Sequence, residues 1–329
     1  MKAVVVTALG GPEVLRLEEV AAPEPQPGEV LIRVAATSVN FADIKARQGR
    51  YHGAGQPPFI PGLDAAGTVE AIGDGVGSVA VGDRVIAFPK GGSYAEYVVA
   101  PANLVFPIPA AVDWDQAAAL PTVAFTAYKL LHDVGRVVPG ERVLVHAAAG
   151  GVGTTAIQLA KLMGASMVIG TVSRKEKASV ARDAGADAVI NYSQEDFVAP
   201  VRELTDGQGA DVILDSVGGT VAERSLEALA WFGRLVHFGS ASGETGHIRV
   251  GDLHASCRAV LGFSLGTARA RRPELLKPAA DAVLAYVQSG QLAMRIGRRY
   301  HLHEAADAQK WMESRESTGK IVLLTKEAE

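Results

Sequence analysis

The stretch HAAAGGVGTTAIQLAK, which begins at His146, constrains the fold of this 329-residue chain more than any other segment. It joins an apolar run, residues 142–148, to a segment with helical periodicity. Gly151, Gly153 and Ala156 match the spacing G-x-G-x-x-[GA] at this junction. Between a strand and a helix, that spacing predicts a tight turn whose helix N-terminus faces the phosphates of a dinucleotide.

Each small residue of this turn has a physical reason. Gly151 permits the turn, Gly153 is expected to let the backbone approach a pyrophosphate, and Ala156 lets the helix lie close to the sheet. The first N–H groups of the helix and its dipole favour negative charge there. The alternative is a glycine-rich turn that binds no ligand. The predicted phosphate contacts are Gly150, Gly151, Val152 and Gly153.

The end of the next strand decides which dinucleotide is bound. An acid about 20 residues after the glycines would hydrogen-bond the ribose of NAD. The segment GTVSRKEKA has no acid at its strand end and carries three cations. A 2′-phosphate is held by such donors, so we expect NADPH, gripped by Ser173, Arg174 and Lys177. The alternative is that these residues form the solvated first turn of a helix.

The pattern of strand-like and helix-like segments along the sequence indicates two domains. Short β-type runs separated by Gly- and Pro-rich turns fill the first third, which is typical of a partly closed antiparallel barrel. Apolar strands then alternate with amphipathic helices, the pattern of a doubly wound parallel sheet. The last segments leave that alternation, so we return them to the first domain. The predicted domains are a catalytic domain, 1–122 with 264–329, and a coenzyme domain, 123–263.

Composition excludes several classes of function. A formal net charge of −4 without a long basic run argues against a nucleic-acid partner. The basic stretch at Arg269–Glu274 is expected to be a solvated helix entry. No apolar stretch reaches transmembrane length and no signal peptide is recognised, so we expect a cytoplasmic protein. The single cysteine, Cys257, excludes intrachain disulfides and is expected to fill buried space.

Several motifs carry a resemblance that covers essentially the whole chain. GERVLVHAAAGGVGTTAIQLAK, GGPEVL, VINYSQED, DSVGG and ESRESTGK are similar to motifs of the zinc-free quinone oxidoreductases, the zeta-crystallin-like branch of the medium-chain dehydrogenase/reductase superfamily. The resemblance implies a Rossmann coenzyme domain joined to a GroES-like barrel. It also implies a homodimer that pairs through an edge strand, which we place at CRAVLGF, Cys257–Phe263.

The zinc ligands of related dehydrogenases are not matched. Asn40 or Phe41 stands where those enzymes carry a cysteine, and Leu63 and Asp64 replace their His-Glu pair. Three convergent ligands are needed for a catalytic zinc, so Asp64 is expected to be isolated and no metal is predicted. His301 and His303 are expected to share one face of a solvated strand.

The resemblance assigns three candidate catalytic residues. Asn40 resembles an active-site asparagine that contacts the nicotinamide ribose or substrate; its alternative is an Asx turn that caps a helix. Tyr51 resembles a tyrosine that donates a proton in enoyl reductases, or it only lines the pocket. Thr126 resembles a threonine near the nicotinamide, with a helix-interior hydroxyl as the alternative.

Further coenzyme contacts are expected at the ends of strands in the sheet, where such sheets hold ligands. Tyr192 is expected near the adenine. Lys320 resembles a C-terminal basic residue near the coenzyme, with an ordinary surface lysine as the alternative. On the nicotinamide side the expected strand-end contacts are Ser216, Phe238, Gly239, Ser240 and Ser242. The segment LGFSL resembles the place where the family's backbone contacts the carboxamide, which adds Phe263 and Leu265.

These observations predict an enzyme that reduces quinones or α,β-unsaturated carbonyls. Without a Lewis acid, a conjugated acceptor is the suitable substrate because it spreads the charge of the incoming hydride to a distal oxygen. An enoyl-thioester reductase is the enzymatic alternative. A non-catalytic NADPH-binding protein with a crystallin-like or regulatory role is the alternative from another class.

Overall fold

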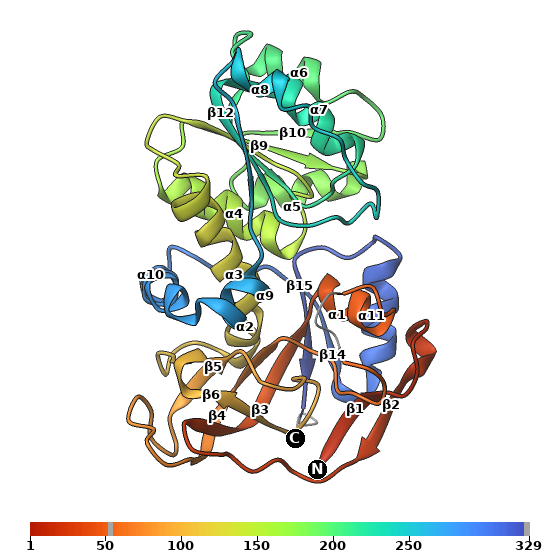
Figure 1. The fold of residues 1–329 in the computed structure, drawn as a ribbon, viewed down its shortest axis with the longest axis vertical. Coiled ribbons are helices and arrows are strands. Elements are labelled where there is room, and N and C mark those ends of the chain that lie inside the picture. Colours follow the sequence, from red (N-terminus) through yellow and green to blue (C-terminus); the bar gives the residue numbers. More distant parts are fainter. Residues whose placement is uncertain (52–54, 326–329) are drawn as a thin grey trace. The chain divides into compact units, whose positions relative to one another are not determined.

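The computed structural model describes residues 1–51 and 55–325. The chain divides into two compact units, which Figure 1 colours along the sequence. The first unit comprises Met1–Val123 and Arg269–Glu329, and the second comprises Ala124–Ala268. The boundaries expected from the sequence lie at 122/123 and 263/264.

The second unit contains a six-stranded sheet in the order β10-β9-β8-β11-β12-β13, and every pairing in it is parallel. The order reverses between β8 and β11, so the topological switch point lies at the carboxyl ends of these two strands. The doubly wound parallel sheet predicted from the sequence is confirmed. The strands are β8 (Arg142–Val145), β9 (Met167–Val172), β10 (Ala188–Asn191), β11 (Ala210–Asp215), β12 (Leu229–His237) and β13 (Ala259–Gly262).

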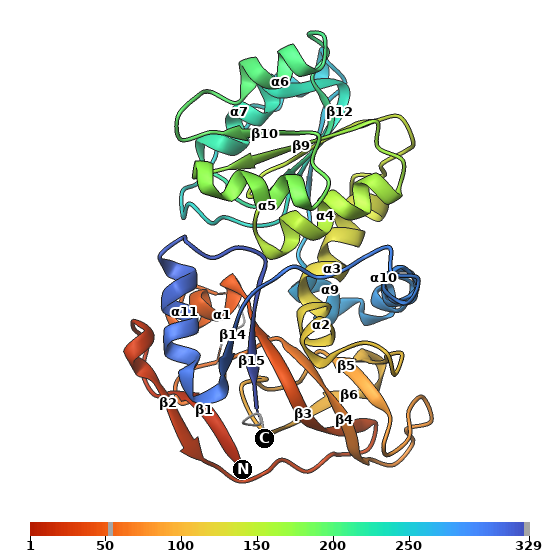
Figure 2. The ribbon, with the colours of Figure 1, turned by 180° about the vertical axis from the view of Figure 1, so that it is seen from behind.

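Helices cover both faces of this sheet. α4 packs against α5 and α6 packs against α7, and the two pairs lie on opposite faces (Figures 1 and 2). The central strands are therefore apolar throughout, and Val143, Leu144 and Val145 are almost completely buried. The helices are α4 (Gly151–Leu162), α5 (Ala178–Asp183), α6 (Val198–Leu204), α7 (Thr220–Ala228) and α8 (Gly251–His254).

The first unit is built on a mostly antiparallel seven-stranded sheet with the order β14-β15-β3-β4-β5-β7, and β6 pairs with β3 off this path. A separate hairpin, β1 (Lys2–Val6) with β2 (Leu15–Glu19), completes it. This is the GroES-like barrel that the sequence predicts. The other strands are β3 (Glu29–Val39), β4 (Asp64–Ile72), β5 (Arg84–Ala87), β6 (Tyr97–Pro101), β7 (Val105–Pro107), β14 (Ile296–His301) and β15 (Lys320–Leu324).

Strand β15 joins the C-terminal segment to the N-terminal barrel, because it pairs antiparallel with β3 and parallel with β14. Helices α1 (Phe41–Arg47) and α11 (Ala305–Glu313) lie beside each other (Figure 2), and Arg47 on α1 bonds Glu313 on α11. α2 (Trp114–Ala119) and α10 (Leu276–Gln288) also belong to this unit. Two more helices, α3 (Pro121–Tyr128) and α9 (Leu265–Arg271), span the boundaries between the units.

Three local expectations need correction. Cys257, expected to fill buried space, is exposed in the turn between α8 and β13, where it has a left-handed φ of 52°. β14 ends at His301, so His303 lies in the following 3-10 helix and not on the same strand, although the two rings stack with their centroids 5.7 Å apart.

The basic stretch is solvated at Arg271, Arg272 and Glu274, as expected. Arg269 departs from that expectation, since its guanidinium lies over the ring of the fully buried Phe88.

Candidate functional site

The glycine turn of the second unit begins helix α4 directly after strand β8. Gly150 is the extended N-cap and Gly151 is the first helical residue. A Cβ atom on Gly153 would lie 2.4 Å from the backbone oxygen of Ala147. Close packing of the chain on itself therefore also requires Gly153, and the expected close approach of a ligand stays a prediction. The first N–H groups of a helix have no partner within it, which leaves those of α4 available to a phosphate.

The turn stores some backbone strain. Ala147, two residues after the end of β8, has a φ of 51°, a left-handed conformation that costs an alanine on the order of 1 kcal/mol. Its carbonyl accepts the N–H of Gly150, which closes the turn before α4. The sequence gives no sign of this residue, because alanine carries no signal for left-handed backbone.

The candidate 2′-phosphate residues follow β9, which ends at Val172 without an acid. Ser173 is half-buried, and its carbonyl accepts the hydroxyl of Ser193 from beyond β10. Arg174 is exposed and precedes a 3-10 turn, Lys175–Lys177. The three predicted residues thus lie together next to the glycine turn, since β9 neighbours β8.

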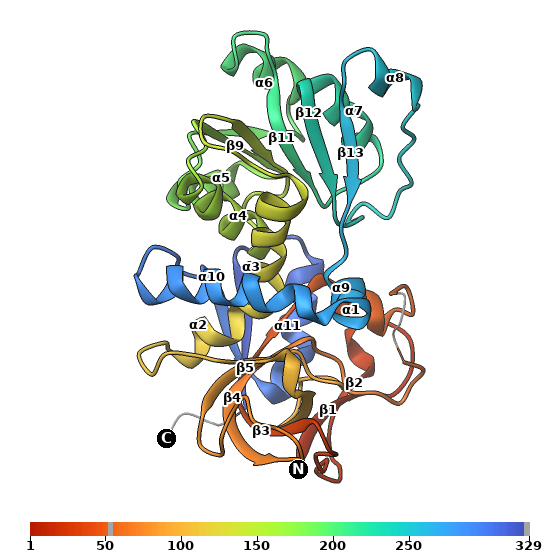
Figure 3. The ribbon, with the colours of Figure 1, turned by 60° about the vertical axis from the view of Figure 1, so that its left-hand side comes forward.

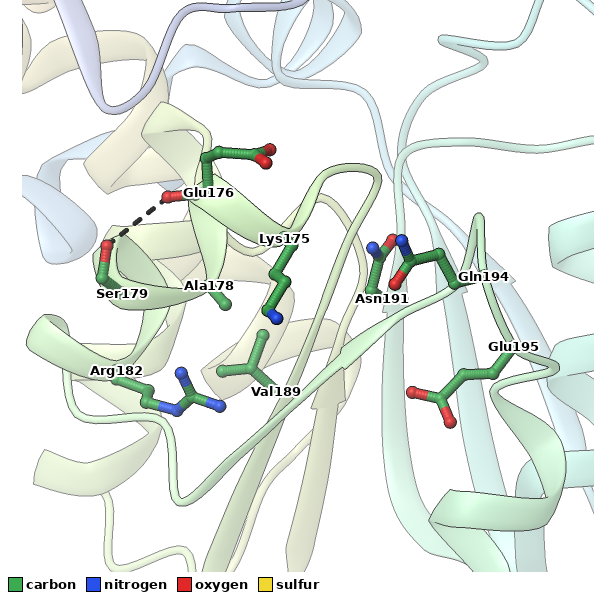
Figure 4. A pocket seen from close by; sticks show the side chains of 9 residues that line it. All are labelled: Lys175, Glu176, Ala178, Ser179, Arg182, Val189, Asn191, Gln194 and Glu195. Carbon is green, nitrogen blue, oxygen red and sulfur yellow. Dashed lines mark hydrogen bonds between the residues drawn. The ribbon is translucent and has the colours of Figure 1, made fainter.

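A pocket of about 450 Å³ adjoins this segment (Figure 4). Lys175 and Arg182 point toward Val189 within it, and the acids Glu176 and Glu195 balance their charge. Its lining does not include the predicted Arg174 or Lys177. The lining residues are Lys175, Glu176, Ala178, Ser179, Arg182, Val189, Asn191, Gln194 and Glu195.

The loops after β11 and β12 form the other half of the sheet's carboxyl edge. Backbone hydrogen bonds join the two loops: the N–H of Ala241 donates to Ser216 O at 2.9 Å, and the N–H of Ser242 donates to Val217 O at 3.0 Å. Phe263, after β13, donates its N–H to His237 O at 3.0 Å. The structure therefore brings the predicted nicotinamide-side residues together. They are Ser216, Phe238, Gly239, Ser240, Ser242 and Phe263, while Leu265 is buried at the start of α9.

Two residues of this edge were not selected from the sequence. Asp215 and His237 end β11 and β12 in direct register, and His237 Nδ1 lies 2.8 Å from Asp215 Oδ2. The Asp215 hydrogen bond raises the pKa of His237. Burial favours a higher pKa for Asp215, but the His237 ring and neighbouring groups hold it below its usual value. Both directions favour the imidazolium–carboxylate pair. The one signal in the sequence is that each residue directly follows an apolar run.

The remaining candidates of the second unit are dispersed. Tyr192 follows β10 and is half-buried against the apolar cluster around Ile190 and Phe197. Thr126 is 6% exposed within α3. Their expected contacts with the adenine and the nicotinamide stay predictions.

The first unit contains a buried polar cluster centred on Asp64, at the start of β4. Lys320 Nζ lies 2.7 Å from Asn40 Oδ1 and 3.4 Å from Asp64 Oδ2, and Asn40 Nδ2 donates to the same Asp64 oxygen at 2.8 Å. Lys320 also donates to the backbone oxygen of Val39 at 3.2 Å. All three side chains are at most 6% exposed. Asp64, expected to stand without fellow zinc ligands, is instead held by hydrogen bonds, because five donors from Ser38, Asn40, Lys320 and Thr122 converge on its carboxylate.

The cluster fixes two further elements. Asp64 Oδ1 accepts the N–H of Thr122 at 2.9 Å and its hydroxyl at 2.5 Å, which caps the start of α3. Ser38 donates to Asp64 Oδ2 at 2.7 Å. Burial lowers the pKa of Lys320, and the nearby carboxylates oppose that shift. Lys320 is therefore an interior cation and not the surface lysine of the alternative interpretation.

Asp43 lies beside this cluster on α1. Its Oδ2 accepts the backbone N–H of Asn40 at 2.8 Å and the hydroxyl of Tyr94 at 3.1 Å. Burial raises the pKa of Asp43 to about 7, and its hydrogen bond from Asn40 opposes the rise. The Asn40 backbone thus has the helix-capping role of the alternative interpretation, while its amide side chain contacts Lys320 and Asp64.

No zinc site is formed by these residues. Within 1–51 and 55–325, no three His, Cys, Asp or Glu side chains converge as metal ligands. The one acid at a zinc-ligand position, Asp64, already faces the ammonium of Lys320. A dication would have to displace that ammonium, so the donor set does not fit zinc and no step is assigned to a metal.

Comparison with known proteins defines the class. Residues 26–110 match the alcohol dehydrogenase GroES-like domain, and residues 151–281 match the zinc-binding dehydrogenase domain. The chain is 40% identical to a quinone oxidoreductase of Pseudomonas aeruginosa, over 98% of this chain and 99% of that protein. It is 39% identical to a 2-haloacrylate reductase of a Burkholderia species, over 98% of both.

A solved structure agrees with these matches. The quinone oxidoreductase of Escherichia coli, solved with NADPH, superimposes with a TM-score of 0.92 at 35% identity and covers 98% of this chain and all of that one. A GroES-like barrel joined to a dinucleotide-type sheet defines a nucleotide-dependent oxidoreductase. The chain belongs to the medium-chain dehydrogenase/reductase superfamily, in its quinone oxidoreductase-like branch.

Proposed function

We propose that this protein is an NADPH-dependent reductase of quinones or α,β-unsaturated carbonyl compounds. The observation that carries the proposal is the second unit's carboxyl edge, where a glycine turn is followed by a strand end that has cations and no acid. The relatives support it, because they include a quinone oxidoreductase, a 2-haloacrylate reductase and a structure with NADPH.

The residues at this edge fit the coenzyme. Gly150, Gly151, Val152 and Gly153 would hold its pyrophosphate, and Ser173, Arg174 and Lys177 would hold its 2′-phosphate. When bound, NADPH supplies a hydride. The chain's own contribution is to orient the nicotinamide half through the loops after β11, β12 and β13, and to exclude competing reactions.

We assign the acceptor to the first unit's residues. Asn40 is oriented by Lys320 and Asp64, so its amide is held in one position before any ligand binds. Tyr51 is half-buried and would line the acceptor's binding site or supply a proton. Thr126, in the second unit, would contact the nicotinamide. A coenzyme contact of Lys320 stays a prediction, and the structure adds that its ammonium is already paired.

We also propose a homodimer that forms through strand β13. This strand is the terminal strand of its sheet, and it is only partly buried. Trp231 and Phe232, on the neighbouring β12, are 68% and 69% exposed. Pairing two such edges would cover unpaired backbone and apolar side chains. Light scattering at micromolar concentration is expected to give twice the chain mass, and a monomer would contradict the dimer.

The protein is proposed to act in the cytoplasm, where its single cysteine needs no disulfide partner. Within the described ranges, no helix is both long and apolar enough to cross a bilayer.

An acceptor panel tests the proposed activity. The purified protein and NADPH are mixed with 1,4-benzoquinone, a 2-alkenal, 2-chloroacrylate or a crotonyl thioester, and the absorbance at the reduced-nicotinamide band is followed. We expect oxidation of NADPH with the quinone, the alkenal or the haloacrylate. Turnover of the thioester alone would favour the enoyl-thioester alternative, and tight NADPH binding without any turnover would favour the non-catalytic one.

A further inference from the structure

The ends of β11 and β12 hold a charged pair that the proposed function does not yet use. His237 is the last residue of β12 and Asp215 the last of β11, and the two are register partners in adjacent parallel strands. Asp215 is fully buried, while the His237 side chain is 41% exposed. The histidine thus turns its bonded nitrogen inward and leaves part of its ring at the surface of the sheet's carboxyl edge.

Asp215 is held rigidly in this pair. Its Oδ1 accepts the N–H groups of Val217 and Gly218 at 2.8 Å and 3.1 Å, and its Oδ2 faces His237 Nδ1 at 2.8 Å. The carboxylate therefore belongs to the turn after β11 and cannot follow the histidine away from it. Such a fixed carboxylate sets the tautomer and orientation of its histidine partner and favours the protonated ring.

The groups around the pair do not compete for its proton. His146, after β8, bonds Thr171 and Ser225 on its two ring nitrogens, and burial lowers its pKa to about 4. Glu244, in the loop after β12, lies against Gly219, and the same loop carries His247, whose backbone N–H donates to Glu223. Strand β13 pairs with His237 through Gly262, which does not titrate. The charged group that shifts the pKa of His237 is Asp215.

The topology places the pair on one half of the coenzyme. In a sheet of this order, each half binds one mononucleotide across the switch point. The glycine turn after β8 and the cationic segment after β9 belong to the adenosine half. The ends of β11 and β12, with Asp215 and His237, therefore belong to the nicotinamide half.

From this position, and resting on the proposed coenzyme function, we propose that His237 selects the reduced over the oxidised coenzyme. The nicotinamide ring of NADPH is neutral, whereas that of NADP⁺ carries one positive charge. The imidazolium is the exposed member of the pair and Asp215 the buried one, so the positive charge lies nearer to a ligand at this edge. Protonation of His237 therefore weakens binding of the oxidised form, against the attraction of the Asp215 carboxylate, and leaves the reduced form unaffected. His237 thus retains the reductant and promotes release of the spent coenzyme, while Asp215 acts as its positioning residue.

The size of the effect follows from the charges. At a separation of roughly 8 Å, one unit charge changes the affinity for another by about twofold in a water-like medium, and by roughly thirtyfold at an effective dielectric constant of about 20. We therefore expect a roughly tenfold contribution from His237 to the ratio of the NADP⁺ and NADPH dissociation constants.

Calorimetric titration of both coenzymes from pH 6 to pH 9 tests the proposal. The ratio of the two dissociation constants cancels the shared 2′-phosphate and adenine contacts. In the unaltered protein the ratio is expected to fall as pH rises and His237 loses its proton. In His237→Asn it is expected to be low and independent of pH. Asp215→Asn removes the carboxylate, so the fall is expected at lower pH.

His254→Asn is the matched control, because His254 is an exposed histidine of the same unit, on α8. It is expected to keep the ratio and the pH profile of the unaltered protein. Equal ratios for His237→Asn and the unaltered protein at pH 6 would overturn the inference even if both bind NADPH tightly. Failure of the unaltered protein to bind either coenzyme would instead overturn the proposed function. An NMR titration of the histidine rings reports the protonation of His237 in the unaltered protein, in Asp215→Asn and in His254→Asn. Circular dichroism checks that every variant, His237→Asn included, is folded.

Discussion

The polar side chains singled out in the two units differ in their exposure to solvent. In the first, Asn40, Asp64 and Lys320 are buried and bond one another, so their charges are neutralised inside the barrel. In the second, Arg174 is exposed and His237 half-exposed at the open end of a sheet. The first set is shielded from solvent and holds the geometry of the barrel, whereas the second is open to solvent and, in the proposed function, faces the coenzyme. Variants of the two sets should therefore fail differently.

Removal of the buried ammonium is expected to have the largest effect on stability. Lys320→Met leaves Asp64 without its cation, and breaking a buried pair costs about 3–5 kcal/mol in the free energy of unfolding. Urea denaturation measures this loss. The exposed Lys310→Met, on α11, should change stability by less than about 0.5 kcal/mol.

A second variant keeps that prediction testable if Lys320→Met does not fold. Replacing both partners, Lys320→Met with Asp64→Leu, removes the unpaired charge and should recover part of the lost stability. A double variant less stable than Lys320→Met alone would show that the ion pair is not the source of the effect.

A further loss of stability is expected from a substitution in the glycine turn that begins α4. Gly153→Ala places a Cβ atom 2.4 Å from Ala147 O, so the turn must shift. We expect a loss of about 1–3 kcal/mol in stability together with weaker NADPH binding. Gly251→Ala, where a Cβ atom meets nothing within 4 Å, is the control and should be tolerated. Unchanged stability and coenzyme affinity in Gly153→Ala would contradict the claim that close packing against Ala147 requires glycine at this position.

Much of this arrangement was predictable, and its limits have physical causes. Strand–helix alternation and the glycine spacing are local patterns, so they predicted the parallel sheet and the glycine turn that begins α4. The pairing of Lys320 with Asp64 joins residues far apart in sequence and appears only once β15 lies against β3. Asp215 and His237 are recognisable as a pair only when the register of β11 and β12 is known. Cys257 was misjudged because composition says nothing of a left-handed turn.

The buried cluster should also respond to pH. Asp43 has its pKa raised to about 7 by burial, against an ordinary value of 3.8. The protonated carboxyl therefore contributes fully to stability below about pH 4, and up to roughly 4 kcal/mol of the free energy of unfolding is lost as pH rises toward 7. Thermal unfolding between pH 4 and pH 8 measures this, and Asp43→Asn should flatten the dependence. An unchanged pH profile in that variant would exclude Asp43 as its origin.

Substitution of the cations after β9 is expected to change coenzyme affinity without changing the free energy of unfolding. Arg174→Ala and Lys177→Ala are each expected to weaken NADPH binding about tenfold, with NADH binding and unfolding unchanged. Arg182→Ala changes a cation of the pocket in Figure 4 that is not among the predicted phosphate contacts, and it should leave both affinities intact. Loss of NADPH affinity in Arg182→Ala alone would move the phosphate site into that pocket.

The most direct test of the account is a calorimetric comparison of NADPH and NADH with the unaltered protein. A strand end with hydroxyl and cationic donors and no acid predicts that NADPH binds at least tenfold more tightly than NADH. Equal affinities for the two coenzymes, or a preference for NADH, would contradict it.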